Sequence, residues 1–145
     1  MFLAKRDCRR LIRPAAFPGC RVPAHATAVG KALLAHLSAT EFMVLYPEEA
    51  LPALTPSTIT SRKELQHVLQ TVRQDGNAQT RQESTLNLCC FSSPVYEASG
   101  RVSFALSICL ATEEPSPERR EAATRSVLLG AQSMWTSSTP RIRRR

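Results

Sequence analysis

Residues 21–35, with the sequence RVPAHATAVGKALLA, limit the possible fold more than any other segment. Pro23 breaks the preceding chain and leads into a helix. Gly30 and the alanines around it carry little side-chain bulk, so we expect another part of the backbone to approach this helix closely. The 3.6-residue period predicts an apolar face made of Val29, Leu33 and Leu37.

The chain is long enough to enclose that helix in one domain. It has 145 residues, of which 43% are hydrophobic and 21% charged, as is ordinary for a globular protein. A domain of this length can bury roughly 68–70% of the surface of its unfolded chain. We expect one domain over residues 1–139, followed by a basic C-terminal tail at 140–145.

The net charge of +7 is concentrated at the two ends. Residues 1–21 hold six Lys or Arg and one Asp, and residues 141–145 hold four Arg, which leaves residues 22–140 with a net charge near −2. A DNA-binding domain carries its positive charge on one face or helix, so no direct DNA binding by this chain is expected. The tail is either a solvated end or a contact for phosphates or an acidic surface.

The cysteines and histidines lack the spacing of a metal site or a disulfide framework. The five cysteines are Cys8, Cys20, Cys89, Cys90 and Cys109, an odd number without a CxxC pair. Free thiols fit a reducing cytoplasm. Neither a glycine-rich phosphate loop nor paired carboxylates occur, so no metal and no cofactor are expected. The sequence also lacks a secretion signal and an apolar run of ~18 residues, which predicts a soluble protein without a membrane partner.

Local patterns predict a hairpin and a short helix in the first third of the chain. Residues 2–6 and 9–12 flank a turn and favour a β-hairpin. Ser38 and Glu41 have the spacing of a capping box, which opens a short helix that Pro47 stops.

The clearest helix signal follows at Ser61, where Glu64 again completes the spacing of a capping box. Gly76 is expected to end this helix. One buried stripe is predicted from the i, i+3, i+4, i+7 spacing of Leu65, Val68, Leu69 and Val72.

From residue 77 the pattern becomes that of strands, with a β-hairpin of residues 89–96 and 101–111 around a turn at 97–100. The apolar face of the second strand comprises Val102, Phe104, Leu106, Ile108 and Leu110. The other face is small and partly polar, with Ser103, Ala105, Ser107 and Cys109. If Tyr96 pairs with Arg101, Cys90 faces Ser107 and Ser92 faces Ala105.

Ser116 and Pro117 open a last helix as N-cap and first helical residue. Its buried face is expected to hold Ala123, Val127, Ala131 and Met134. Trp135 should anchor its far end, and Pro140 ends it. The whole order predicts an α+β fold, an antiparallel sheet flanked by helices.

Four small polar side chains of the predicted hairpin fall on one face, beside the start of the helix that contains Ala24. They are Cys90, Ser92, Ser107 and Cys109. A helix N-terminus offers unpaired N–H groups and partial positive charge, so this arrangement could bind a small carboxylate. The alternative is that small residues only let the helix pack close to the sheet.

Five stretches of the sequence together resemble the effector-binding domain of IclR-type transcriptional regulators. They are residues 2–12, 24–35, 54–60, 94–95 and 99–102. The resemblance implies a GAF/profilin-like fold that binds a small organic acid effector and regulates transcription through ligand-dependent association. The implied partner is a second copy or a full-length family member. The implied ligand-binding residues are Ala24, through its backbone, with Thr80, Cys90, Ser107 and Cys109.

This chain departs from the family pattern at several of these positions. The family often has an acidic residue where Thr80 stands, glycine where Asn87 stands, and Ser-Gly-Pro where Cys109, Leu110 and Ala111 stand. Glu83 matches an acidic position of the family, and its alternative roles are surface solvation or a salt bridge.

The resemblance begins inside a strand at Phe2, so we expect an N-terminally truncated domain that lacks its first elements and the family's winged helix-turn-helix. Two other functions stay open. The chain could be a truncated interaction protein that modulates full-length family members. It could also be a hydrolase with Cys89 or Cys90 as nucleophile and His25 as base. We expect a non-enzyme.

Overall fold

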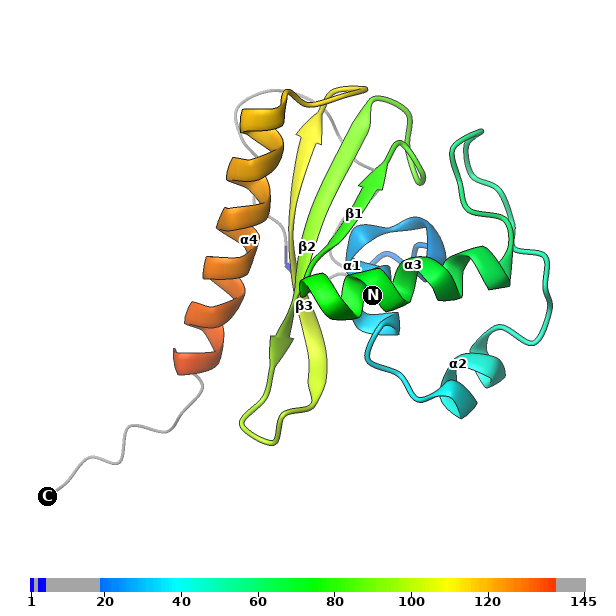
Figure 1. The fold of residues 1–145 in the computed structure, drawn as a ribbon, viewed down its shortest axis with the longest axis horizontal. Coiled ribbons are helices and arrows are strands. Elements are labelled where there is room, and N and C mark those ends of the chain that lie inside the picture. The colour runs from blue at the N-terminus through cyan, green and yellow to red at the C-terminus, as the bar shows by residue number, and fades with distance from the viewer. Residues whose placement is uncertain (2, 5–18, 138–145) are drawn as a thin grey trace, which may run out of the picture.

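The computed structural model describes residues 1, 3–4 and 19–137 (Figure 1). Its elements are a 3₁₀ turn η1 (Ala24–Ala26), α1 (Ala28–Leu34), α2 (Ala39–Leu45), α3 (Arg62–Asp75), β1 (Ala78–Arg81), β2 (Leu88–Tyr96), β3 (Val102–Ala111) and α4 (Pro117–Ser137). The predicted α+β class is confirmed. The hairpin expected within residues 2–12 and the basic tail at 140–145 lie outside the described residues. In the described part, no helix has the length and apolarity needed to cross a membrane.

The three strands form one antiparallel sheet in the order β1-β2-β3. The predicted register of β2 and β3 is wrong by two residues, because Cys90 faces Cys109 and Ser92 faces Ser107. A β-bulge between Val95 and Tyr96, together with a longer turn, shifts the pairing. A shift of two residues leaves every side chain on its face, so the predicted division of β3 into two faces survives.

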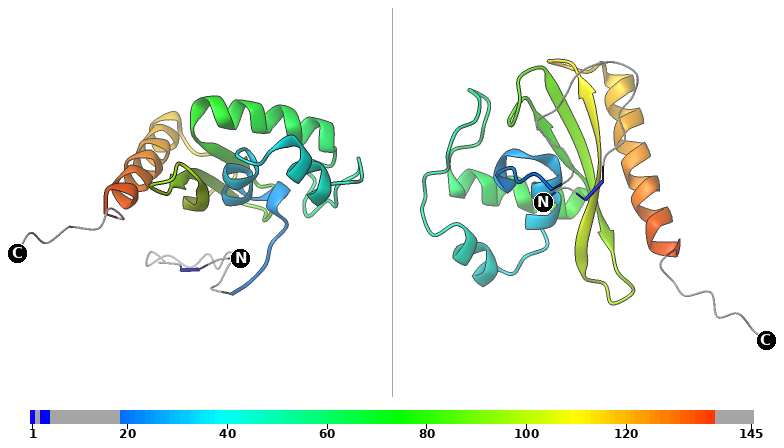
Figure 2. Two further views of the ribbon diagram at one scale, coloured as in Figure 1. Left: turned by 90° about the horizontal axis from the view of Figure 1, so that it is seen from below. Right: turned by 180° about the vertical axis from the view of Figure 1, so that it is seen from behind.

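The two faces of the sheet are covered by different helices, α4 on one side and α1 with α3 on the other (Figure 2). On the α4 side, one core cluster consists of Cys89, Phe91, Ala123 and Val127. On the opposite side, Ala28 of α1 packs against Leu88 and Cys90 of β2. The two neighbouring cysteines therefore belong to different sides of the sheet.

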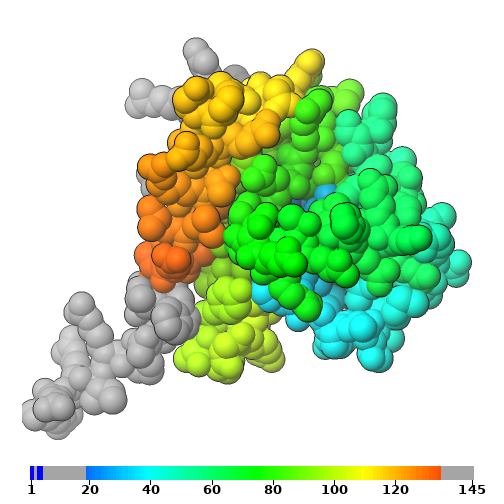
Figure 3. Space-filling view, viewed as in Figure 1, coloured from blue at the N-terminus to red at the C-terminus, as the bar shows by residue number. Residues whose placement is uncertain are grey.

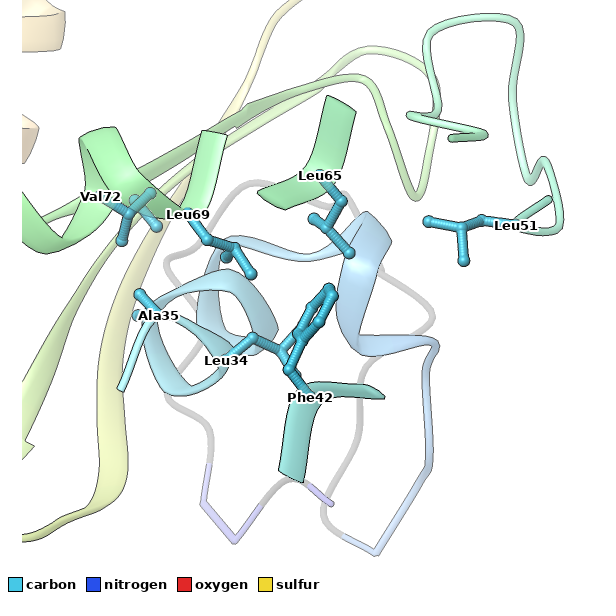
Figure 4. Packing of buried hydrophobic residues seen from close by; sticks show 9 residues of the cluster. Leu34, Ala35, Phe42, Leu51, Leu65, Leu69 and Val72 are labelled. Atoms are coloured by element: carbon cyan, nitrogen blue, oxygen red, sulfur yellow. The ribbon is translucent and has the colours of Figure 1, made fainter. Parts of the chain in front are cut away.

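The larger core lies between α1, α2 and α3 (Figure 4). Its buried residues are Ala32, Leu34, Ala35, Phe42, Leu51, Leu65, Leu69, Val72 and Ala78. The stripe predicted for α3 is confirmed: three of its members are buried here, and Val68 packs against them partly buried. Gly76 ends α3 in the left-handed conformation with a φ of 69°, as its sequence position predicts.

The helix predicted from Pro23 is in fact divided, and α1 begins only at Ala28. Its predicted apolar face is wrong, because Val29 and Leu33 are half-buried and Leu37 lies beyond the last residue of α1. The expected close approach is confirmed at Gly30, where an added Cβ would lie 2.1 Å from the carbonyl oxygen of Ala24. The buried side of α1 therefore holds Lys31 and Leu34 as well as the small residues.

The helix starts predicted at Ser38 and Ser61 are present. Ser38 Oγ accepts from the Glu41 N–H at 3.2 Å, and the Glu41 carboxylate accepts from the Ser38 N–H at 2.8 Å, which completes a capping box. At α3, Ser61 Oγ caps the Glu64 N–H at 3.2 Å, while its own hydroxyl donates to Glu49 at 2.8 Å.

The face predicted for α4 is buried at Ala123, Val127 and Ala131 but not at Met134, which is 46% exposed. The buried stripe of α4 ends at Ala131. The last described turn of the helix therefore extends beyond the part of α4 that packs against the sheet. The anchoring role expected for the Trp135 side chain lies outside the described residues.

Candidate functional site

Three of the residues expected to bind ligand form a row across the sheet. Thr80 of β1 is the register partner of Cys90 of β2, and Cys90 is the partner of Cys109 of β3. Ser107 lies two residues before Cys109 and therefore on the same face of β3. We call these four residues, Thr80, Cys90, Ser107 and Cys109, the hydroxyl–thiol patch.

The polar atoms of this face are close together. The sulfurs of Cys90 and Cys109 are 2.7 Å apart, and the Cys90 thiol donates to Cys109. Ser107 Oγ lies 4.0 Å from Cys109 Sγ and donates to the carbonyl oxygen of Phe91 at 3.0 Å. Thr80 and Cys90 are buried, Ser107 is half-buried and Cys109 is exposed. The patch thus runs from the interior at β1 to the surface at β3.

Both buried thiols are held in the protonated form. The neighbouring Cys109 and burial raise the pKa of Cys90. Burial also raises the pKa of Cys89, whose thiol donates to the carbonyl oxygens of Thr112 and Glu113 at 3.4 and 3.3 Å. A cysteine nucleophile requires the opposite shift, because only the thiolate attacks.

His25 has a structural role in the same part of the chain. It is 2% exposed, its Nε2 lies 2.9 Å from the carbonyl oxygen of Pro52, and its ring meets the Tyr46 ring edge to face at 6.3 Å. A histidine held in this way packs η1 against the segment that follows α2. The packing role of His25 does not favour the hydrolase alternative. The raised pKa values of Cys89 and Cys90 do not favour it either.

Ala24 lies apart from the hydroxyl–thiol patch. It belongs to η1 and packs against the core around α3, whereas the residue of α1 that touches Cys90 is Ala28. Thr27 caps α1, and its hydroxyl accepts from the Gly30 N–H at 3.0 Å. One of the N–H groups expected to meet a carboxylate is therefore already satisfied inside the protein.

A buried ion pair beside the patch was missed by the sequence reasoning. Lys31 of α1 is 1% exposed, and its Nζ donates to both carboxylate oxygens of Glu83 at 2.6 and 2.7 Å. Burial lowers the pKa of Lys31, and Glu83 partly offsets this. For Glu83, a salt bridge was one of the expected alternatives. For Lys31, the available signal was a lysine within a run of small residues, directly after Gly30.

Two threonines hold the segment that follows β1 and contains Glu83. Thr58 Oγ1 donates to the carbonyl oxygen of Glu83 at 2.6 Å and accepts from the N–H groups of Leu54 and Thr55. Thr55 Oγ1 donates to the carbonyl oxygen of Gln82 at 2.6 Å. These bonds fix a segment in which Gln82 has a φ of 56°, in the left-handed region. The hydrogen bonds that fix the backbone of this segment therefore orient the Glu83 carboxylate toward Lys31.

Other candidate features lie elsewhere. A shallow groove between β1 and α4 is visible in Figure 3 and is lined by Gln79, Pro117, Arg120, Glu121, Thr124, Arg125 and Leu128. It is on the opposite side of the sheet from the patch, because Gln79 and Thr80 are adjacent in a strand. No group of three His, Cys, Asp or Glu side chains suited to a metal occurs in the described part of the chain.

Comparisons with known proteins identify relatives along nearly the whole chain. Residues 1–134 match the family model described as "Bacterial transcriptional regulator IclR C-terminal". The HTH-type transcriptional repressor AllR of Klebsiella pneumoniae is 33% identical over 119 residues, which cover 82% of this chain and 44% of the repressor. The chain spans about half the length of the curated relatives it matches.

Solved structures agree with the sequence match. The C-terminal domain of the Escherichia coli transcriptional regulator KdgR is similar, with a TM-score of 0.76 and 32% identity, over 83% of this chain and 74% of that one. The inducer-binding domain of the PobR transcription factor from Acinetobacter was solved as a double mutant in complex with 3-hydroxybenzoic acid. Its TM-score is 0.75 and its identity 28%, over 87% of this chain and 72% of that one.

Proposed function

Because this chain belongs to the IclR family of bacterial transcriptional regulators, as a C-terminal domain, we propose that it binds a small organic acid at the hydroxyl–thiol patch. Binding would bias its association with a second copy or with a full-length family member, and so regulate transcription. Such an activity places the protein in the cytoplasm, where the DNA is. It requires no catalytic step.

The observation that carries this proposal is the row Thr80, Cys90 and Cys109, which crosses all three described strands and continues at Ser107. Hydroxyl and thiol groups donate and accept hydrogen bonds without bringing a net charge. They suit the carboxylate and hydroxyl oxygens of a small acid, because a charge-assisted hydrogen bond is stronger than a neutral one.

Close helix packing alone does not account for the whole face. It explains why Ala28 lies against Cys90, but Cys109 and Ala111 on β3 are exposed in the structure. The exposed Cys109 is better suited to contact a ligand than to pack against a helix. The PobR domain supports the class of ligand, since its partner in the solved complex is an aromatic hydroxy acid.

Thermal denaturation of the protein with pyruvate and with 3-hydroxybenzoate tests the proposal, because a ligand that binds only the folded state raises the melting temperature. We expect a shift with at least one of the two acids. Ser107→Ala should weaken that shift, whereas the control Ser133→Ala, on α4 at the opposite side of the sheet, should not. Absence of a shift with either acid, or an equal shift in Ser107→Ala, would argue against this site.

A further inference from the structure

The two cysteines of the hydroxyl–thiol patch are placed as a pair that can be joined. Cys90 and Cys109 are register partners on antiparallel strands, and their sulfurs are 2.7 Å apart. The Cα atoms of such partners lie about 4.5–5.5 Å apart. That separation falls within the range of roughly 4.4–6.8 Å that a disulfide spans. The sulfurs have to approach by only about 0.7 Å to reach the bond length of a disulfide.

We propose that Cys90 and Cys109 form a reversible disulfide when the protein meets a hydroperoxide, and that this bond closes the hydroxyl–thiol patch to its ligand. The disulfide itself follows from the geometry of the pair. Its consequence for ligand binding rests on the function proposed above.

Cys109 is the thiol that reacts first. It is exposed, and the hydrogen bond that it accepts from Cys90 stabilises negative charge on its sulfur. The Cys109 thiolate attacks the O–O bond of the hydroperoxide and becomes a sulfenic acid, and the alkoxide that leaves takes up the proton that Cys109 lost. The hydroperoxide is thereby reduced to an alcohol.

Cys90 then resolves the sulfenic acid. Cys90 passes its proton to the departing hydroxyl group, and the thiolate formed in this way attacks Cys109 Sγ, so the hydroxyl group leaves as water. The pair has lost two electrons, and the hydroperoxide has accepted them. The raised pKa of Cys90 agrees with this order, because Cys90 keeps its proton until the second step.

The pairing is selective among the described cysteines. Cys89 is adjacent to Cys90 but points to the α4 side, where it is buried with Phe91 and Val127. Cys20 lies before η1, outside the sheet. Cross-linking Cys90 to Cys109 would remove both thiol groups from the face that the ligand needs.

Mass spectrometry tests the bond directly. The reduced full chain is treated with hydrogen peroxide, alkylated with N-ethylmaleimide and measured intact and as peptides. We expect the loss of two hydrogen atoms, two fewer alkylated thiols and a peptide pair containing Cys90 and Cys109, all reversed by dithiothreitol. Cys90→Ser and Cys109→Ser should each abolish the cross-link, and Cys20→Ser and Cys89→Ser should leave it intact.

Sulfinic acid on Cys109 without a cross-link, or a bond from Cys109 to another cysteine, would overturn the proposal. Thermal shifts with pyruvate and 3-hydroxybenzoate, measured before and after oxidation, distinguish formation of the disulfide from its effect on ligand binding. If the shift is lost on oxidation and returns with dithiothreitol, the disulfide controls ligand binding at the patch. An equal shift in the reduced and the oxidised protein overturns that part of the proposal. If the bond forms but neither acid shifts the reduced protein, the proposed function fails and the disulfide stands.

Discussion

Lys31 Nζ lies 2.6 and 2.7 Å from the two carboxylate oxygens of Glu83, which follows 52 residues later in the chain. The lysine is 1% exposed, so both charges are taken from water and satisfied within the protein. The pair joins α1 to the segment that follows β1. It therefore connects the helix that packs on Cys90 with the strand that carries Thr80.

Removing one partner of this pair should be strongly destabilising. Lys31→Met leaves a buried carboxylate without its cation, for which a loss of about 3–5 kcal/mol in the free energy of unfolding is expected. The double variant Lys31→Met/Glu83→Leu should lose less than either single variant, because no buried charge is left unpaired. Urea denaturation measures all three. A double variant that loses the sum of the single losses would contradict a direct coupling.

Gly30→Ala should destabilise the protein through backbone crowding. Its new Cβ would lie 2.1 Å from the carbonyl oxygen of Ala24, so the turn before α1 must move, at a cost of about 1–3 kcal/mol. Gly130→Ala is the matched control in α4, because its Cβ meets only the flexible Leu106 side chain. We expect a smaller loss there, measured by chemical denaturation. Equal losses would show that the Ala24 contact is not what restricts Gly30.

Thr58→Val should weaken the attachment of the Glu83 segment. The valine cannot accept from the N–H groups of Leu54 and Thr55 or donate to the carbonyl oxygen of Glu83. Leaving such buried groups unsatisfied costs about 1–3 kcal/mol. Ser57→Ala, at an exposed neighbouring position, serves as control and should change the free energy of unfolding little. A neutral Thr58→Val would indicate that water replaces these bonds.

Stability should fall as the pH drops below the ordinary pKa of histidine because of His36. Burial, with a smaller contribution from Arg73, lowers the pKa of His36 in the folded protein. In the pH range between this lowered pKa and the ordinary value near 6.5, the unfolded chain binds a proton that the folded protein does not, so acid favours unfolding.

The variant His36→Gln isolates this contribution. We expect the free energy of unfolding of the variant to change less than that of the parent between about pH 7.5 and about pH 5.5. The glutamine also loses the ring contact with Tyr96, whose centroid lies 5.4 Å from that of His36, and Tyr96→Leu controls for that loss. An unchanged pH dependence in His36→Gln would assign the effect to other groups.

Local patterns in the sequence are sufficient to predict those structural features that depend only on residues close together in the chain. The stripe of α3, the cap at Ser38 and the stop at Gly76 each rest on spacings of a few residues, and all are present. The close approach at Gly30 was also predictable, because glycine and its neighbouring alanines leave room for another part of the backbone. The same spacing misplaced the apolar face of α1, since which side of a short helix is buried depends on what covers it.

The contacts that give the patch its chemistry depend on the tertiary structure. The facing of Cys90 and Cys109 depends on a bulge at Val95 and Tyr96 together with a longer turn. Combined, they shift the register by two residues, which leaves the alternation of apolar and polar residues unchanged. The partner of Lys31 depends on the packing of α1 against the end of β1. The amino-acid sequence by itself determined the starts of α2, α3 and α4, the faces of the strands and the family, because these follow from short-range periodicity and motifs. Only the folded chain decided which distant polar atoms meet, because that is set by register and packing across many residues.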